Sequence, residues 1–246
     1  MSQIVMVPRE KRPFRVNALS AGILFIVADL ASFLSLPFMA PVNSSNYLVD
    51  ISANTGLVAT AAILIFIGGV AAIGISVSLY PALKQHDASL ALGATSFRTV
   101  EGVLDFIAVA MLLTLITLSQ KFVGAGIPDA SYYESLGSIM LSGHHWVINV
   151  CKLMAFSIGA MLYYVVFYRT RMVPRWLSGW GIVAVIMTII SAVLVMYEAV
   201  APFSLGQIVL NLPILFQEMV LAVWLIMKGL DVPSGKATSS KVVDVQ

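Results

Sequence analysis

Three charged residues, Arg98, Glu101 and Asp105, follow one another at spacings of three and four within a long apolar segment. Residues three and four apart share one face of an α-helix, so Arg98 can pair with Glu101 while Glu101 faces Asp105. Two neighbouring carboxylates cannot both stay ionised cheaply in a medium of low dielectric constant, unless a cation lies near. The spacing therefore indicates a proton-exchanging centre, or a site for a cation or amine. The alternative is that Arg98 neutralises Glu101 and the cluster only locks helices together.

Further carboxyl groups fall at a similar depth in other apolar segments. With a rise of about 1.5 Å per residue, Asp29, Asp105 and Glu218 each lie roughly 14–16 Å from the end of their segment that is nearer the basic loops. All three are therefore expected near the middle of the membrane, where charged side chains face the interior of a helix bundle. We assign seven residues to one polar midplane site: Asp29, Arg98, Glu101, Asp105, Lys152, Gln217 and Glu218.

A second polar stripe consists of His145, Asn149 and Lys152, which are spaced by four and three. Lys152 either pairs with Asp105 or Asp29, or extends along its helix to water. His145 and Asn149 would form an external gate to the midplane site, although a hydrated interfacial histidine is the alternative for His145. His144 and His145 point about 100° apart on a helix, which suits two ligands of one metal poorly. We therefore expect no metal site and no cofactor.

The elements that must position these residues are transmembrane helices. The 246-residue chain is 59% hydrophobic and 11% charged, with a mean hydropathy of +0.95. Several apolar runs reach the roughly 20 residues that cross a bilayer as a helix. We predict an all-α membrane protein, a bundle of six transmembrane helices near 18–39, 57–80, 94–118, 146–168, 179–199 and 205–227. Pro213 predicts an interruption in the last of them, because it cannot donate to the carbonyl of Val209.

Lysine and arginine residues alternate between the two sides of the predicted bundle. They are concentrated before the first span, in the second and fourth connections and in the tail, whereas the first and fifth connections contain none. By the positive-inside rule, both termini are cytoplasmic. We therefore expect a basic N-terminal segment (1–17), a six-span domain (18–230), a disordered cytoplasmic tail (231–246), and a multi-pass location in the cytoplasmic membrane.

Two segments near the membrane surfaces allow simple interpretations. The third connection, residues 120–145, is expected to be extracytoplasmic, either as a loop with a helical turn or with a short interfacial helix at 132–141. An aromatic anchor at the cytoplasmic interface is expected from three tyrosines and two tryptophans: Tyr163, Tyr164, Tyr168, Trp176 and Trp180.

Three stretches carry a resemblance to a known family. They are LYPALKQHDASLALGATSFRTVEGVL (79–104), YRTRMVPRWLSGWGI (168–182) and LPILFQEMVLAVWLIMKGL (212–230). Each places polar residues at unusual points of an apolar helix, and together they resemble the bacterial integral-membrane family catalogued as domain of unknown function 4386. The likeness runs in order from the first span to the sixth. It implies a six-span protein of the bacterial inner membrane and brings no activity, cofactor or catalytic residue.

Three classes of function fit these observations. The first is a small proton-linked transporter or permease-like protein, with the polar midplane site around a cavity. The second is a ligand-binding, sensing or structural membrane protein, whose polar core only locks the bundle. The third is an intramembrane enzyme that modifies lipids, which is weakened because common hydrolase motifs are absent. The expected partners are the lipid bilayer, a small solute or protons, and a second copy of the chain in a homo-oligomer. No nucleic acid is expected.

Overall fold

A computed structural model describes residues 14–125 and 130–231. Most of the expected basic segment (1–17) and of the expected tail (231–246) lies outside these ranges. All the secondary-structure elements of the described residues are helices. The elements are α1 (Arg15–Phe38), α2 (Tyr47–Ala53), α3 (Thr55–Leu83), α4 (Ala88–Ala125), α5 (Ala130–Trp146), the π-helical segment η2 (Val147–Lys152), α6 (Leu153–Thr170), α7 (Arg175–Met196) and α8 (Leu205–Met227).

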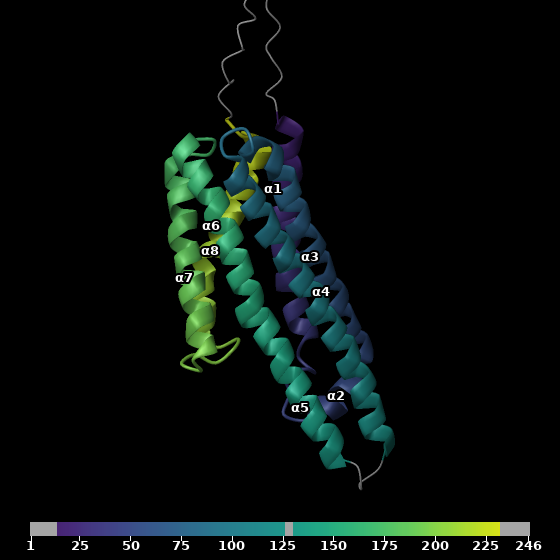
Figure 1. The fold of residues 1–246 in the computed structure, drawn as a ribbon. Coiled ribbons are helices and arrows are strands. Elements are labelled where there is room, and N and C mark those ends of the chain that lie inside the picture. The colour runs from purple at the N-terminus through teal and green to yellow at the C-terminus, as the bar shows by residue number, and fades with distance from the viewer. Residues whose placement is uncertain (1–13, 126–129, 232–246) are drawn as a thin grey trace, which may run out of the picture.

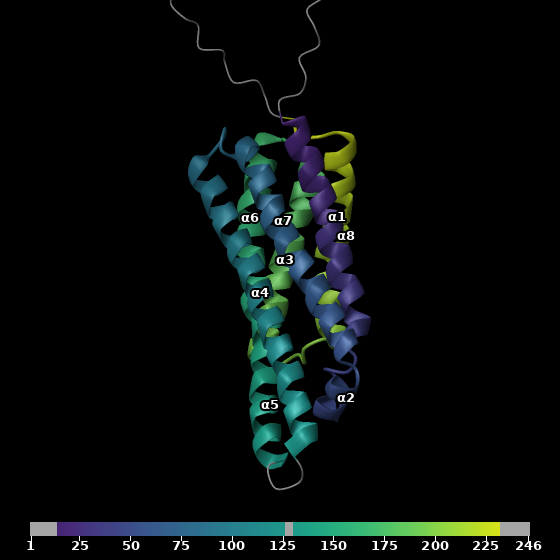
Figure 2. The ribbon, with the colours of Figure 1, turned by 90° about the vertical axis from the view of Figure 1, so that its right-hand side faces the viewer.

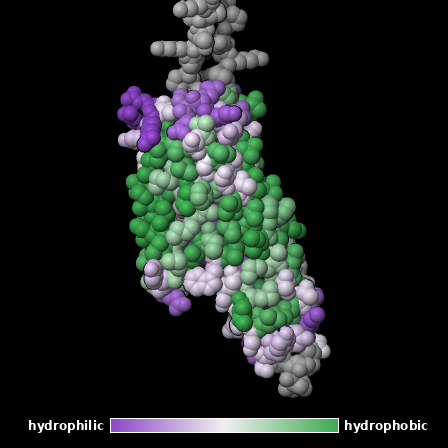
Figure 3. Space-filling model, in the orientation of Figure 1, coloured by the Kyte–Doolittle hydropathy of each residue, from purple (hydrophilic) through white to green (hydrophobic). Residues whose placement is uncertain are grey.

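Within the described residues, six helical stretches are long and apolar enough to cross a membrane, with α5, η2 and α6 together forming the fourth. Apolar side chains cover the flanks of the bundle and polar side chains gather at its two ends (Figure 3). The predicted all-α architecture of six membrane-spanning helices is therefore confirmed, and the protein is an integral membrane protein.

The six long helices form a closed ring in the order in which they occur along the chain. Each packs on the next, α1 on α3, α3 on α4, α4 on α6, α6 on α7 and α7 on α8, and α8 returns to pack on α1. The start of α1 and the end of α8 lie together at one end of the bundle (Figure 1). There, Arg15 Nη2 donates to the carbonyl of Ile226 at 2.6 Å. We call this end the terminal end, and the other end the distal end.

The distal end contains more helix than the sequence suggested. Residues 130–146 form α5, which continues without a break through η2 into α6. Of the two alternatives for the third connection, the loop with a helical turn is therefore wrong, and the short helix at 132–141 is part of a longer helix. The short helix α2 was also not expected. The pair of α4 and α5 extends well past the loop that joins α7 to α8, with α2 beside it (Figures 1 and 2). This extension has its own apolar core, formed by residues such as Leu48, Ile51, Leu112 and Leu115.

Local chemistry explains where some of these helices begin and how closely they pack. The Asp87 carboxylate accepts a hydrogen bond from the backbone N–H of Leu90 at 2.9 Å, which caps the start of α4. Between α3 and α4, a Cβ on Gly102 would lie 2.6 Å from the carbonyl oxygen of Gly69. Only glycine permits this approach, which brings the charged face of α4 against α3. Pro213 lies inside α8 without ending it, so the predicted interruption is wrong.

Candidate functional site

A cavity of about 270 Å³ with charged side chains in its wall lies near the middle of the ring of helices. Every one of the six spans contributes to its wall, which contains four carboxyl groups and two cations. The lining residues are Ala28, Asp29 and Ser32 of α1, Gly68 and Ala72 of α3, Arg98, Glu101 and Asp105 of α4, Lys152 of η2, Leu153 and Phe156 of α6, Thr188 of α7, and Asn211, Ile214, Leu215 and Glu218 of α8.

The first ion pair of the cavity lies within a single helix. The Arg98 guanidinium approaches the Glu101 carboxylate to 2.9 Å, and both side chains are buried. The guanidinium also lies 5.0 Å from the centre of the Phe156 ring, a distance at which a cation interacts with an aromatic face. A Cβ on Gly159 would lie 3.0 Å from Cγ of Arg98, so this glycine of α6 leaves room for the arginine stem. The pair neutralises charge but does not bridge two helices.

The second ion pair connects two helices. Lys152 Nζ lies 2.6 Å from the Asp105 carboxylate, whose side chain is almost fully buried. Lys152 is the last residue of η2, where the backbone is wound as a π-helix. Such segments insert extra residues into a helical turn and are common at functional sites, because they alter which side chains face the interior. The structure therefore places Lys152 in the cavity wall, paired with Asp105.

Two carboxyl groups of the cavity have no cationic partner among the described residues. Asp29 Oδ2 is buried and forms no hydrogen bond. Glu218 accepts a hydrogen bond from the Tyr163 hydroxyl at 3.3 Å. Both ion pairs of the described chain involve other carboxylates. Since α1 packs on α8, Asp29 and Glu218 face the cavity from two adjacent helices.

A layer of buried hydrogen bonds closes the bundle between the cavity and the terminal end. The hydroxyl of Tyr164 donates to the side-chain oxygen of Gln217. The amide nitrogen of Gln217 in turn donates to the carbonyl of Leu177 on α7 at 3.2 Å. With the bond between Tyr163 and Glu218, this layer joins α6, α7 and α8, and we call it the tyrosine layer. The expectation that Tyr163 and Tyr164 anchor the membrane interface is wrong, because both rings are buried in the core.

A second hydrogen-bonded layer lies between the cavity and the distal end. Gln207 Nε2 donates to Asn149 Oδ1 at 3.0 Å, and Gln207 Oε1 accepts from the backbone N–H of Phe203 at 2.6 Å. Asn149 Nδ2 donates to the carbonyl of His145 at 3.0 Å. This layer joins η2 to α8 and to the loop before it. Asn149 is buried in it, whereas the imidazole of His145 lines a separate pocket further toward the distal end.

The structure brings together six of the seven residues assigned to the midplane site. Gln217 lies outside the cavity wall and belongs to the tyrosine layer. Sequence reasoning missed Gln207 and the roles of the two tyrosines. Gln207 had a signal, since it precedes Asn211 by four residues and Glu218 by eleven and so continues one polar stripe of α8.

The chemistry of the cavity is that of its carboxyl groups and the two cations. Within residues 14–125 and 130–231, no group of three or more histidine, cysteine, aspartate or glutamate residues could hold a metal. The four carboxyl groups of the cavity come from three helices, and two of them are paired with the two cations. What the cavity offers chemically is a set of protonatable groups with room beside them.

Comparisons with known proteins place the whole bundle in one family. The model of a family described as "Domain of unknown function (DUF4386)" matches residues 20–229. No curated protein and no solved structure matches the chain.

Proposed function

Because the chain belongs to the family described as a domain of unknown function, DUF4386, we propose its function from the cavity alone: the protein is a small transporter that couples movement of a solute to proton exchange at Asp29 and Glu218. The proposed location is the bacterial cytoplasmic membrane with both termini in the cytoplasm. In support, Lys84, Arg169, Arg175 and other basic residues of the short connections gather at the terminal end.

The observation that carries this proposal is the imbalance of charge in the cavity. Four carboxyl groups meet two cations, and both cations are already paired with Glu101 and Asp105. An ionised carboxylate without a partner at this depth costs several kcal/mol. Asp29 and Glu218 are therefore each stable when they hold a proton or contact a cationic group. A carboxyl group that must hold either a proton or a cationic group, and that lies beside a cavity, is suited to exchanging protons for a solute.

The hydrogen-bonded layers on either side of the cavity further support transport. Alternating access requires one closure toward each side of the membrane, and the two closures must open in turn. The tyrosine layer with Gln217 separates the cavity from the terminal end, and Asn149 with Gln207 separates it from the distal end. Both consist of a few side-chain hydrogen bonds between helices. Bonds of this kind are worth about 1 kcal/mol each, so either layer can open without unfolding the bundle.

A structural role is the second candidate, and the ion pair between Lys152 and Asp105 favours it because this pair joins two helices. A purely structural core does not account for the rest of the cavity. Arg98 and Glu101 pair within one helix, so this ion pair fixes no helix to another, although the contact of Arg98 with the Phe156 ring reaches α6. One carboxyl oxygen of Asp29 is buried without a hydrogen bond, and such an unsatisfied acceptor destabilises the fold. A serine or alanine at this position would avoid that cost, so stability alone does not explain the aspartate.

The proposal is tested first by proton exchange, which requires no knowledge of the solute. In nanodiscs, infrared difference spectra across the physiological pH range should contain the carbonyl band of protonated carboxyl groups. Asp29→Asn and Glu218→Gln should each remove part of this band, and the double variant should abolish its pH dependence. Glu134→Gln, which removes an exposed carboxyl group at the distal end, is the matched control. An unchanged spectrum in the double variant would overturn the proposal.

Flux is tested next in proteoliposomes that contain a pH-sensitive dye. A panel of small amines, organic acids and sugars is added outside, and the pH inside is followed. We expect at least one solute class to drive proton movement with wild-type protein and the Glu134→Gln control, and not with the Asp29→Asn/Glu218→Gln variant. Dye responses that are the same in liposomes without protein would argue against transport.

A further inference from the structure

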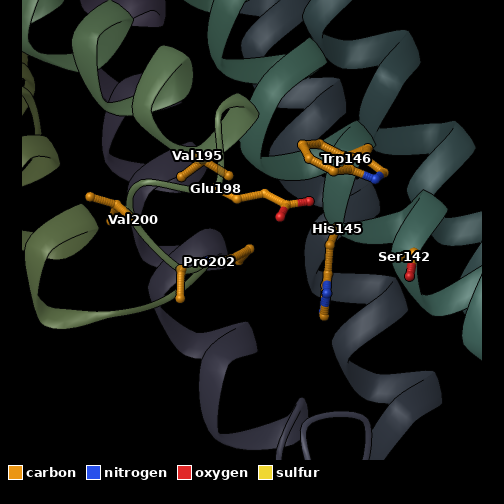
Figure 4. Close-up of a pocket in the computed structure, with 8 residues that line it drawn as sticks. Ser142, His145, Trp146, Val195, Glu198, Val200 and Pro202 are labelled. Carbon is orange, nitrogen blue, oxygen red and sulfur yellow. The ribbon is translucent and has the colours of Figure 1, made fainter.

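A pocket of about 290 Å³ lies at the distal end, between the end of α5 and the loop that joins α7 to α8. Its wall combines one carboxylate with an imidazole, an indole ring and apolar side chains. The lining residues are Ser142, His145, Trp146, Val195, Glu198, Val200, Ala201 and Pro202. The Glu198 side chain extends from the loop across the pocket toward Trp146 (Figure 4). The pocket is separated from the central cavity by the hydrogen bond between Asn149 and Gln207.

Glu198 is one of four non-glycine residues of the described chain with a left-handed backbone conformation. α7 ends with Glu198 N–H donating to the carbonyl of Val195 and Ala199 N–H donating to that of Leu194, both at 2.9 Å. This pattern places Glu198 at the position after the helix that normally holds glycine, and its φ of 57° is left-handed. A non-glycine residue is strained in this conformation. The chain therefore retains a carboxylate here at the expense of local stability.

The charge of Glu198 is not neutralised within the described chain, where it forms no ion pair. The loops at this end are also poor in cations: residues 40–54 and 197–204 contain neither lysine nor arginine. The pocket is thus an acidic, partly apolar recess at an end of the molecule with little basic charge to compete for it.

From this combination we infer that the distal pocket binds an organic ammonium group. The Glu198 carboxylate supplies the counter-charge, and the Trp146 ring supplies an aromatic face for the cation or the body of the ligand. Val195, Val200 and Pro202 suit a small apolar substituent. A calcium ion would need six or more oxygen ligands, which one carboxylate cannot provide, and an anion would be repelled. The inference does not rest on the proposed transport, because it concerns equilibrium binding outside the central cavity.

The ammonium group can belong to a free amine or to the headgroup of phosphatidylethanolamine. The test uses the full chain in nanodiscs and isothermal titration calorimetry with phenethylamine as the probe. Uncharged 2-phenylethanol is the matched control probe. The first set of nanodiscs contains phosphatidylglycerol, which has no ammonium group, and the second set contains phosphatidylethanolamine. Weaker binding in the second set identifies the headgroup as a competing ligand of the same site, and equal binding identifies the free amine; both outcomes support an ammonium site.

Two variants of one residue separate loss of binding from loss of fold. Glu198→Gln removes the charge, and Glu198→Gly removes it while relieving the left-handed strain, so the glycine variant should be at least as stable as wild type. Both should bind phenethylamine at least about tenfold more weakly, since a charge-assisted contact is lost. Glu134→Gln, the same charge change at the same end, should bind like wild type. Absence of phenethylamine binding by wild type, equal binding of 2-phenylethanol, or wild-type affinity in both Glu198 variants would overturn the inference.

Discussion

Neutralising Asp105 should have a very different effect from neutralising Asp29 or Glu218. Asp105 lies 2.6 Å from Lys152, and Coulomb's law with an effective dielectric constant of about 20 gives an attraction of about 6 kcal/mol at that separation. Desolvation offsets part of this, but removing one partner leaves the other charge unpaired, which costs about 3–5 kcal/mol in buried pairs. We therefore expect Asp105→Asn to lower the free energy of unfolding by about 3–5 kcal/mol. Asp29→Asn and Glu218→Gln, which break no ion pair, should leave it unchanged or raise it.

The assay is equilibrium unfolding of each variant in the same detergent or lipid, followed by circular dichroism. Replacing both partners of the pair, Asp105→Leu with Lys152→Met, should restore much of the stability, since no unpaired charge then remains. The reasoning is refuted if Asp105→Asn is neutral. It is equally refuted if Asp29→Asn destabilises the protein as strongly as Asp105→Asn, because Asp29 would then be a structural partner and the proposed exchange site would be lost.

Three further predictions concern the core, the helix packing and the distal end. Tyr164→Phe should lower the free energy of unfolding by about 1–3 kcal/mol in the same assay, because the side-chain oxygen of buried Gln217 loses its donor. Gly102→Ala should destabilise by a similar 1–3 kcal/mol, since its Cβ would lie 2.6 Å from the carbonyl oxygen of Gly69; a wild-type unfolding curve would show that the two helices can separate freely. Burial raises the pKa of the Tyr47 phenol in α2, so stability should fall as pH rises above the ordinary tyrosine value of about 10. Tyr47→Phe should reduce that alkaline loss, as measured by unfolding at a series of pH values.

The architecture followed from the sequence because apolar length is a strong signal in membrane proteins. Runs of about 20 apolar residues have few alternatives to spanning helices, so six helices could be placed to within a few residues at most ends. For the segment 130–146 this signal left two alternatives open, a loop with a helical turn or a short helix at 132–141. Its polar residues, such as Glu134 and Ser138, resemble a loop by hydropathy, whereas the helix is stabilised by packing of α5 on α4 and η2. The α2 helix is similarly too short and too polar to be read from composition.

The depth of the carboxyl groups in the membrane could be predicted from the sequence, whereas the partners of several side chains could not. Helical rise places Asp29, Asp105 and Glu218 at one depth, and the structure lines one cavity with all three. The pair of Arg98 and Glu101 followed from spacing within one helix. The partner of Lys152 depends on the rotation of its helix and on a π-helical turn that the sequence pattern did not indicate. Tyr164 was misplaced because a tyrosine near arginine residues is equally typical of an interface and of a buried hydrogen bond.

The circular order of the helices has a consequence for how the protein is made. Since neighbours in the chain are neighbours in space, each newly inserted helix can dock on the one before it as synthesis proceeds. The cavity alone cannot form in this stepwise manner, because its wall is closed by contact between the first span and the last. Until α8 leaves the ribosome and meets α1, the face of α1 that carries Asp29 has no Glu218 opposite it. The site is therefore completed only when α8 is inserted, and we expect a truncated product that lacks this span to form a row of helices whose first and last members do not meet.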